Sequence, residues 1–564
     1  MLGQKPGQKT FTNGKWAMKQ TAKLIGGAGT GKTSTLLKTM EAAVDKLQCD
    51  PSLIGFASFT RAAREEMVDR AADKFDVHPS ILSKHGWFRT VHSTCYRSLG
   101  IRGEQLLSGD DKSTRWIADQ LRVTVTRRAV DDSGFATYVG DEEAAAALNI
   151  WDISRNRVVP LATVHSELSR VGSDVPSFDA VKRFVKKYED AKRLHDKVDF
   201  VDIVGRFAGV EFGLDGPEMV EPRGDLPPGV KVWIFDEYQD SSKLVDLACR
   251  RLSDGPDVIW TYLAADPFQS VFGFGGADYT NFMAWEVDKV KTMPQSWRCP
   301  RPVMELGERC LRRMKAGYFD RGIAPAPHEG SVIREPSIER ALQGVDPSRT
   351  TLVLARCNYS LAKYATILEQ RKIPYARINQ DSDTAHLTAC NAYWRLQNGQ
   401  GISGEQWRAA ISLTPAKGLG EEVFLNRGHK AAWKDGRREG IDYIHPDEIG
   451  DFGPTEHLVG RIRDGRWASL IPGGEKWYAA AKRHGADQAT NPNVRLSTIH
   501  GSKGMEAQDV VLATETSWKI ENAREIDPRS HDEECRIEYV GVTRAKERLI
   551  VCESDEPHSM SLPY

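Results

Sequence analysis

The chain has 564 residues, of which 40% are hydrophobic and 27% are charged, and its formal net charge is −1 because 77 Lys and Arg residues nearly balance 78 Asp and Glu residues. This composition excludes a mainly disordered chain, and no stretch approaches the roughly 20 apolar residues of a membrane-spanning helix. The balanced charge excludes a protein that coats itself in nucleic acid through bulk charge, whereas a local basic groove remains compatible with it.

The nine cysteines are scattered along the chain, and none forms a C-x-x-C pair. A disulfide framework, a zinc ribbon and an iron–sulfur site all require a closer spacing. We therefore expect reduced thiols and a cytoplasmic protein.

Short apolar runs recur along the chain, and each is followed by a turn and a helix-like stretch. Because the runs do not alternate with polar residues, they predict strands covered on both faces, as in parallel α/β sheets. The runs are Lys23–Gly26, Leu53–Thr60, Val232–Phe235, Val258–Ala265, Thr351–Ala355, Val494–Ile499, Val510–Ala513 and Leu549–Cys552.

Two long stretches between these strands have a helical character, so we expect two α/β cores, each with a mainly α-helical insertion. The predicted division assigns residues 1–95 and 201–290 to a first core and residues 96–200 to its insertion. It assigns residues 291–379 and 493–564 to a second core and residues 380–492 to the insertion of that core.

The first predicted strand leads into the segment GGAGTGKT, which fits the pattern G-x-x-x-x-G-K-[ST] and precedes a predicted helix. Its glycines let backbone N–H groups approach phosphate oxygens, and the helix N-terminus attracts anions. We expect Lys32 to reach the β- and γ-phosphates of a nucleotide and Thr33 to hold Mg²⁺. The predicted phosphate-binding loop comprises Gly26, Gly27, Ala28, Gly29, Thr30 and Gly31.

A second strand, Val232–Phe235, ends in the acidic segment DEYQD. Two carboxylates beside a phosphate loop suit Mg²⁺-assisted hydrolysis, with Asp236 in the metal shell and Glu237 orienting and deprotonating the attacking water.

A third strand leads into ADPFQSVFGFGGA, where Gln269 is positioned to sense the γ-phosphate or to place the water. Phe272 and Phe274 lie two residues apart just after this strand. They predict either a platform on which nucleobases stack or packing into the core, and the residues alone leave both readings open.

Seven segments in a fixed order resemble superfamily 1 helicases of the UvrD/Rep/PcrA type. They are GGAGTGKT, FASFTRAAREEM, DEYQD, ADPFQSVFGFGGA, SWR, LSTIHGSKGMEAQDVV and EYVGVTRAKERL. The resemblance implies an α/β fold with two RecA-like parallel-sheet P-loop NTPase domains, with ATP and Mg²⁺ as cofactors. It also implies a bacterium or a phage-infected cell as the source.

For the nucleotide, the resemblance implies that Arg298 and Arg544 stabilise the transferring phosphoryl group and that Trp297 stacks on adenine. Glu506 matches an acid near the nucleotide sugar and γ-phosphate. Ser34 belongs to the same expected site, although relatives often have an arginine there.

For the nucleic acid, the resemblance implies contacts with single-stranded DNA, and it favours the stacking interpretation of Phe272 and Phe274. The further expected DNA-binding residues are Phe59, Thr60, Arg61 and His92 in the first core and Arg356, Asn358, Thr498 and His500 in the second, with Lys417, Gly418 and Gly420 in a loop that resembles the duplex-contacting loop of the family.

The expected function is that of an ATP-dependent DNA helicase or translocase that moves 3′→5′ on single-stranded DNA and separates duplex. Its expected partners are single-stranded DNA and single–double-strand junctions, without a membrane, and the expected state is a monomer or a weak self-associate. The nearest alternative is a DNA-stimulated translocase that displaces proteins without efficient unwinding. More distant alternatives are a P-loop phosphotransferase unrelated to DNA and a catalytically silent DNA-binding module.

Overall fold

The computed structural model describes residues 9–12, 15–59, 61–129, 136–172, 175–378, 381–418, 422–434, 441–553, 557–560 and 562–563. The contacts within the chain divide it into two compact units. The first unit comprises Met1–Gly330, Ser517–Thr543 and Leu562–Tyr564, and the second comprises Ser331–Thr516 and Arg544–Ser561.

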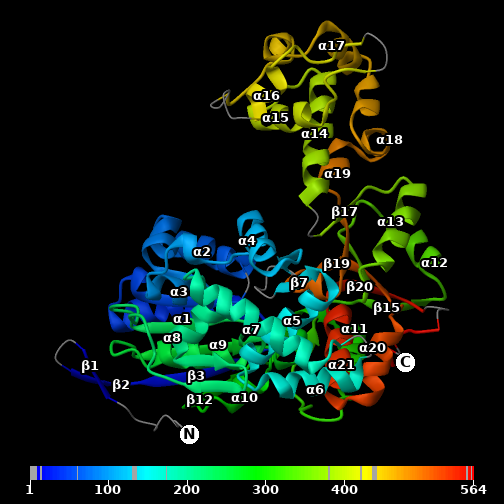
Figure 1. The fold of residues 1–564 in the computed structure, drawn as a ribbon. Coiled ribbons are helices and arrows are strands. Elements are labelled where there is room, and N and C mark those ends of the chain that lie inside the picture. The colour runs from blue at the N-terminus through cyan, green and yellow to red at the C-terminus, as the bar shows by residue number, and fades with distance from the viewer. Residues whose placement is uncertain are drawn as a thin grey trace. The chain divides into compact units, whose positions relative to one another are not determined.

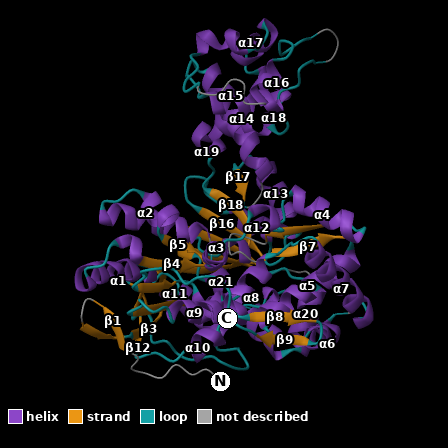
Figure 2. Ribbon diagram, turned by 60° about the vertical axis from the view of Figure 1, so that its left-hand side comes forward, coloured by secondary structure: helices purple, strands orange, loops and turns teal. Residues whose placement is uncertain are grey.

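The first unit is built on a six-stranded sheet whose strands pair in parallel (Figure 2). In sheet order the strands are β12 (Lys289–Thr292), β3 (Gln20–Ile25), β11 (Trp260–Ala265), β10 (Val232–Phe235), β4 (Ile54–Ser58) and β5 (Trp87–Thr90).

Helices cover both faces of this sheet. Ile234 of β10 packs into a core with α1 (Lys32–Leu47) and α2 (Arg61–Phe75). Its neighbours Trp233 and Phe235 pack into another core with three further helices. Those helices are α3 (Val91–Leu99), α8 (Phe200–Ala208) and α9 (Lys243–Ser253). Burial on both faces explains why these strands read as unbroken apolar runs.

A helical insertion with its own core lies between β5 and α8 in the sequence, and Trp151 and Tyr188 are buried at its centre. Its elements are α4 (Asp111–Leu121), β6 (Val125–Ala129), β7 (Ala136–Gly140), α5 (Glu142–Arg157), α6 (Leu161–Val171) and α7 (Phe178–Leu194).

Several shorter elements complete the first unit. They are β1 (Lys9–Thr12), β2 (Lys15–Met18), β8 (Val210–Gly213), β9 (Gly216–Met219), α10 (Thr280–Ala284), β13 (Gln295–Pro300), α11 (Arg301–Leu311), β14 (Ala324–Ala326), α20 (Trp518–Ile526) and α21 (Pro528–Val542). The contacts group residues 291–330 and 517–543 with this unit, whereas the predicted division assigns them to the second core. The domain boundaries therefore stay a prediction.

The second unit contains another parallel six-stranded sheet. In sheet order its strands are β15 (Ser331–Glu335), β20 (Ala545–Cys552), β19 (Ala507–Ala513), β16 (Thr351–Ala355), β18 (Val494–Thr498) and β17 (Tyr375–Arg377). Two helices, α12 (Ile338–Gln343) and α13 (Ser360–Gln370), share a hydrophobic core with the sheet.

A second helical cluster is inserted between β17 and β18 (Figure 1). Trp407, Trp433 and Trp467 are buried within it. Its helices are α14 (Asp381–Gln397), α15 (Gly404–Leu413), α16 (His429–Lys434), α17 (Glu456–Arg463), α18 (Gly474–His484) and α19 (Ala486–Thr490). The predicted fold class, α/β with two parallel sheets that each carry a mainly helical insertion, is confirmed. Over the described ranges, no helix is both long and apolar enough to span a bilayer.

Candidate functional site

The glycine-rich loop joins β3 to α1 and has the shape of an anion cradle. Gly29 and Gly31 have φ of +66° and +79°, a left-handed conformation that favours glycine. Gly31 caps α1 without a side-chain hydrogen bond, so the first turn of the helix keeps N–H groups available. A Cβ added at Gly26 would come within 2.6 Å of the Lys32 and Thr30 side chains. The loop therefore needs a glycine there to close around its own side chains.

Polar side chains hold this loop in place. Lys32 Nζ donates to the Gly27 carbonyl at 3.3 Å, and Thr30 Oγ1 donates to the same oxygen at 3.1 Å. Thr33 follows Lys32 in the first turn of α1. Ser34, one residue further on, accepts a hydrogen bond from Arg70 of α2 at 2.9 Å. A guanidinium group therefore lies beside the start of α1, although it comes from another helix.

The acidic pair lies at the carboxyl end of β10. Asp236 is buried, and burial together with the neighbouring Glu237 carboxylate raises the pKa of Asp236 to about 7, against the opposing effect of the Lys32 ammonium. Glu237 has φ of +54°, which is unusual for a residue with a side chain, and its N–H donates to Asp236 Oδ1 at 2.9 Å. Gln239 Nε2 donates to Glu237 Oε2 at 2.5 Å, which orients that carboxylate.

These groups fit a divalent cation. Mg²⁺ prefers hard oxygen ligands and is usually held by one or two carboxylates together with substrate phosphates. A buried carboxyl group whose pKa is raised by burial and by a like charge gains stabilisation from a nearby cation. Asp236 and the Thr33 hydroxyl supply suitable donors, since both follow strands of the same parallel sheet.

Asp266, which follows β11, is the centre of a buried hydrogen-bond network. Its carboxylate accepts hydrogen bonds from Gln269 Nε2 at 2.8 Å, Arg321 Nη1 at 2.6 Å and the Tyr539 hydroxyl at 3.0 Å. Its own N–H donates to Gln239 Oε1 at 3.2 Å. Gln269, predicted from its motif, is thus connected through Asp266 and Gln239 to the carboxylate of the acidic pair.

The network also reaches the phosphate loop through residues that the sequence reasoning missed. The Ala28 N–H donates to the Tyr539 hydroxyl at 3.3 Å, and Arg321 lies between Asp266 and Glu308. Tyr539 belongs to the segment EYVGVTRA, so the family resemblance could have indicated it as a site residue. Arg321 lies in none of the seven segments.

The SWR segment lies in β13 beside the phosphate loop. Ser296 Oγ donates to the Ala28 carbonyl at 2.8 Å, and the Trp297 N–H donates to the Gly29 carbonyl at 2.8 Å. A Cβ added at Gly29 would meet the Cβ of Arg298 at 2.2 Å, so the two backbones approach closely. The Trp297 side chain is 66% exposed and offers an open aromatic face.

The two other predicted nucleotide residues belong to the second unit. Arg544 is buried, and its Nη1 donates to the Met505 carbonyl at 3.2 Å. Glu506 forms an ion pair with Lys546 at 2.5 Å. Their roles at the nucleotide stay predictions.

Aromatic side chains gather around a cavity in the first unit. Phe59, His92 and Phe274 line it together with Phe200, the first residue of α8, and Arg127 of β6. Phe200 lies edge-on to the His92 ring with centroids 6.2 Å apart, and the Arg127 guanidinium lies 4.9 Å from the Phe200 centroid. The structure thus brings together three predicted DNA-binding residues and adds Phe200 and Arg127.

Desolvation and the Arg127 charge lower the pKa of His92 to about 4, so its ring is neutral at pH 7. Arg61 is exposed at the start of α2, whereas Thr60 lies outside the described residues. Phe200 lies outside the seven segments that carry the family resemblance, so those segments gave no signal for it.

The two candidate stacking residues differ in exposure. Phe272 is fully buried and Phe274 is 38% exposed, with ring centroids 6.0 Å apart and planes at 76°. Phe274 therefore offers its ring to the cavity, whereas Phe272 packs behind it.

In the second unit, four predicted DNA-binding residues follow adjacent parallel strands. Ala355 at the end of β16 pairs with Thr498 at the end of β18. Arg356 and Asn358 therefore follow β16 at the edge of the sheet where Thr498 ends β18 and His500 follows it. In the predicted duplex-contacting loop, the backbone of Lys417 forms an antiparallel bridge with that of Val423. Gly418 donates to the Glu422 carbonyl at 2.9 Å, and Gly420 lies outside the described residues.

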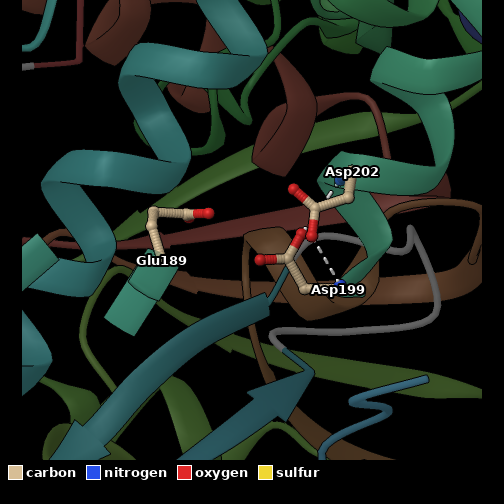
Figure 3. A group of neighbouring side chains, drawn as sticks. All are labelled: Glu189, Asp199 and Asp202. Atoms are coloured by element: carbon tan, nitrogen blue, oxygen red, sulfur yellow. Dashed lines mark hydrogen bonds between the residues drawn. The ribbon is translucent and has the colours of Figure 1, made fainter. Parts of the chain in front are cut away.

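An acidic cluster in the first unit is satisfied by cations of the protein. Its carboxylates, from Glu189, Asp199 and Asp202, lie close together (Figure 3). Lys192 pairs with all three at 2.7 to 3.0 Å, and Arg155 pairs with Asp199 at 2.9 Å and with Asp202 at 3.0 Å. Although burial opposes it, these cations hold the pKa of Asp199 well below its ordinary value. The cluster therefore ties α5, α7 and α8 together.

Comparison with known proteins identifies a family. A model of the UvrD/REP helicase N-terminal domain matches residues 8–289, and a model of the UvrD-like helicase C-terminal domain matches residues 479–556. One relative is the ATP-dependent DNA helicase UvrD1 of Mycobacterium leprae (strain TN), which is 23% identical over 432 residues, covering 71% of this chain and 53% of the relative. Another is the putative ATP-dependent DNA helicase YjcD of Bacillus subtilis (strain 168), which is 21% identical over 616 residues, covering 93% of this chain and 76% of the relative.

A third relative, the ATP-dependent DNA helicase UvrD2 of Mycobacterium tuberculosis (strain ATCC 25618 / H37Rv), is 22% identical over 563 residues, covering 93% of this chain and 75% of the relative. The chain spans about half the length of the first curated relatives that it matches. The two family models match the parts of the chain that carry the phosphate loop, the acidic pair and the EYVGVTRA segment. The chain belongs to the UvrD/REP helicase family.

Proposed function

We propose that the protein is an ATP-dependent DNA helicase that hydrolyses ATP with Mg²⁺ as it moves along single-stranded DNA. One observation carries this proposal, namely the placement of the segment from Asp266 to Phe274. Asp266 is hydrogen-bonded through Gln239 to Glu237, and Phe274 lines the aromatic cavity of the first unit. A segment with this placement can couple a change at a nucleotide to a change at a nucleobase.

For the nucleotide, the loop of residues 26–31 surrounds the phosphates with backbone N–H groups, and Lys32 neutralises charge on the β- and γ-phosphates. Asp236 and Thr33 would hold Mg²⁺, which would neutralise charge on the phosphate oxygens. Trp297, with its exposed ring, stacks on the base, and Ser34 and Glu506 belong to the same site.

Hydrolysis begins when Glu237 orients a water and accepts its proton. The water oxygen forms a bond to the γ-phosphorus as the bond from that phosphorus to the β–γ bridging oxygen breaks, which leaves ADP and inorganic phosphate. Gln269 positions this water, and Arg298 and Arg544 stabilise the negative charge on the transferring group.

For the DNA, the rings of Phe200 and Phe274 stack on bases, and each stack contributes about 1–3 kcal/mol. Phe59 is buried and lines the same cavity. Arg61 contacts the backbone in the first unit, and Arg356, Asn358, Thr498 and His500 do so in the second. Lys417 and its loop contact duplex. Movement in the 3′→5′ direction is part of the proposal and rests on the family resemblance.

Strand separation tests the proposal. The protein with ATP and Mg²⁺ is expected to separate a duplex with a 3′ single-stranded tail and to leave a 5′-tailed duplex paired. Glu237→Gln keeps the size of the side chain but loses the base, so unwinding is expected to fall by about 10²- to 10⁴-fold while nucleotide binding persists. DNA-stimulated hydrolysis without separation of either duplex would instead indicate a translocase that displaces proteins.

A further inference from the structure

One face of α21 holds the segment that follows β11 at three points. Glu533, Arg536 and Tyr539 are spaced three residues apart, so their side chains lie on the same side of the helix. Each contacts a different part of the segment. The Gly273 N–H donates to Glu533 Oε1 at 2.9 Å, Arg536 Nε donates to the Ser270 carbonyl at 2.7 Å, and the Tyr539 hydroxyl donates to Asp266 Oδ2 at 3.0 Å.

The contacts are close and largely shielded from water. Arg536 and Tyr539 are buried, and the Arg536 guanidinium also lies 5.2 Å from the centroid of the Tyr279 ring. A Cβ added at Gly273 would meet Glu533 Oε2 at 2.7 Å, so a side chain at this position would push the carboxylate away. Hydrogen bonds to ionised groups are about twice as strong as those between neutral groups.

The three contacts connect the two ends of the proposed coupling segment. Tyr539 joins Asp266 to the Ala28 N–H of the phosphate loop. Glu533 holds Gly273, which lies between Phe272 and the exposed ring of Phe274. A glycine-rich stretch follows, in which Gly276 has φ of +92°. This stretch provides few side chains of its own that could hold Phe274 in position.

We propose that Glu533 and Arg536 are positioning residues that make the aromatic loop move together with the nucleotide network, and that they thereby set how strongly DNA stimulates ATP hydrolysis. The inference rests on the proposed function. With both residues present, a base that displaces Phe274 also displaces Ser270 and Asp266. Without them, the glycine-rich loop absorbs the movement, and the free energy of DNA binding does not reach the phosphate loop.

The test compares ATP hydrolysis without DNA and at saturating oligodeoxythymidylate in the full chain. For Glu533→Ala and Arg536→Met, basal hydrolysis is expected to stay within twofold of the unsubstituted protein. Stimulation at saturating DNA is expected to fall at least fivefold, a typical size for coupling between sites. Glu533→Gln keeps an oxygen that can accept the Gly273 hydrogen bond and is expected to recover most of the stimulation. If the Glu533→Ala defect came from the lost negative charge alone, Glu533→Gln would share it.

Glu525→Ala supplies the matched control. Glu525 is an exposed glutamate on the neighbouring helix α20, and its substitution is expected to leave stimulation unchanged. The inference is overturned if saturating DNA stimulates Glu533→Ala and Arg536→Met fully and only the DNA concentration for half-stimulation rises. It is also overturned if Glu533→Gln is as defective as Glu533→Ala. An unsubstituted protein that DNA fails to stimulate would instead contradict the proposed function itself.

Discussion

Replacing Phe200 with alanine removes one aromatic ring from the cavity of the first unit. Phe200 is the first residue of α8, and its ring contacts both the His92 ring and the Arg127 guanidinium. A base–aromatic stack contributes about 1–3 kcal/mol. If one base stacks on this ring, the dissociation constant for single-stranded DNA is expected to rise about 5- to 150-fold.

The assay is fluorescence anisotropy of a labelled oligodeoxythymidylate at one fixed salt concentration, because phosphate contacts make affinity depend strongly on salt. Phe200→Leu is the matched control, since leucine keeps much of the apolar volume but has no aromatic face. Both variants are expected to bind DNA weakly, whereas the thermal midpoint of Phe200→Leu is expected to stay near that of the unsubstituted protein. A dissociation constant for Phe200→Ala within twofold of the original would refute the reasoning.

Three further predictions concern stability and nucleotide binding. Arg155→Met leaves buried carboxylates without one of their two cations, which costs about 3–5 kcal/mol. The thermal midpoint is therefore expected to fall, and added Mg²⁺ is not expected to restore it. An unchanged midpoint would contradict the ion-pair account. The pKa of His92 is about 4 when folded, below its ordinary value, so the unfolded chain binds more protons between about pH 6.5 and 4 and stability is lost as the pH falls through that window. His92→Gln is expected to flatten this dependence in thermal unfolding at pH 7 and pH 5, and equal pH slopes in the two proteins would speak against it. Arg70→Ala removes the guanidinium beside Ser34 and is expected to raise the KM for ATP about 2- to 10-fold with little change in kcat, whereas an unchanged KM would exclude a role for Arg70 in nucleotide binding.

The parts of the fold that could be predicted are those set by local pattern. β10 lies in the middle of the sheet with both faces covered, so its residues had to be apolar without alternation. The phosphate loop was predictable because its conformation requires glycines at fixed positions, such as Gly29 and Gly31. In both cases the physical constraint acts within a few residues of sequence.

The parts that could not be predicted depend on pairing between distant residues. Arg321 is defined as a site residue by Asp266, which lies 55 residues away, and no local pattern marks it. The burial of Phe272 beside an exposed Phe274 is likewise a property of tertiary packing. The spacing of two residues between them does not determine which ring is buried. Phe200 lies outside the seven segments that carry the resemblance, and its ring becomes part of the cavity through contacts with α3 and β6.

The most direct test of the account is the rate of ATP hydrolysis with and without single-stranded DNA, with Lys32→Ala as the control. The account predicts a large stimulation by DNA, and it predicts that the substitution abolishes hydrolysis under both conditions because the β- and γ-phosphates lose their lysine. Hydrolysis that proceeds at the same rate with and without DNA would contradict the central claim that this nucleotide site drives movement on DNA.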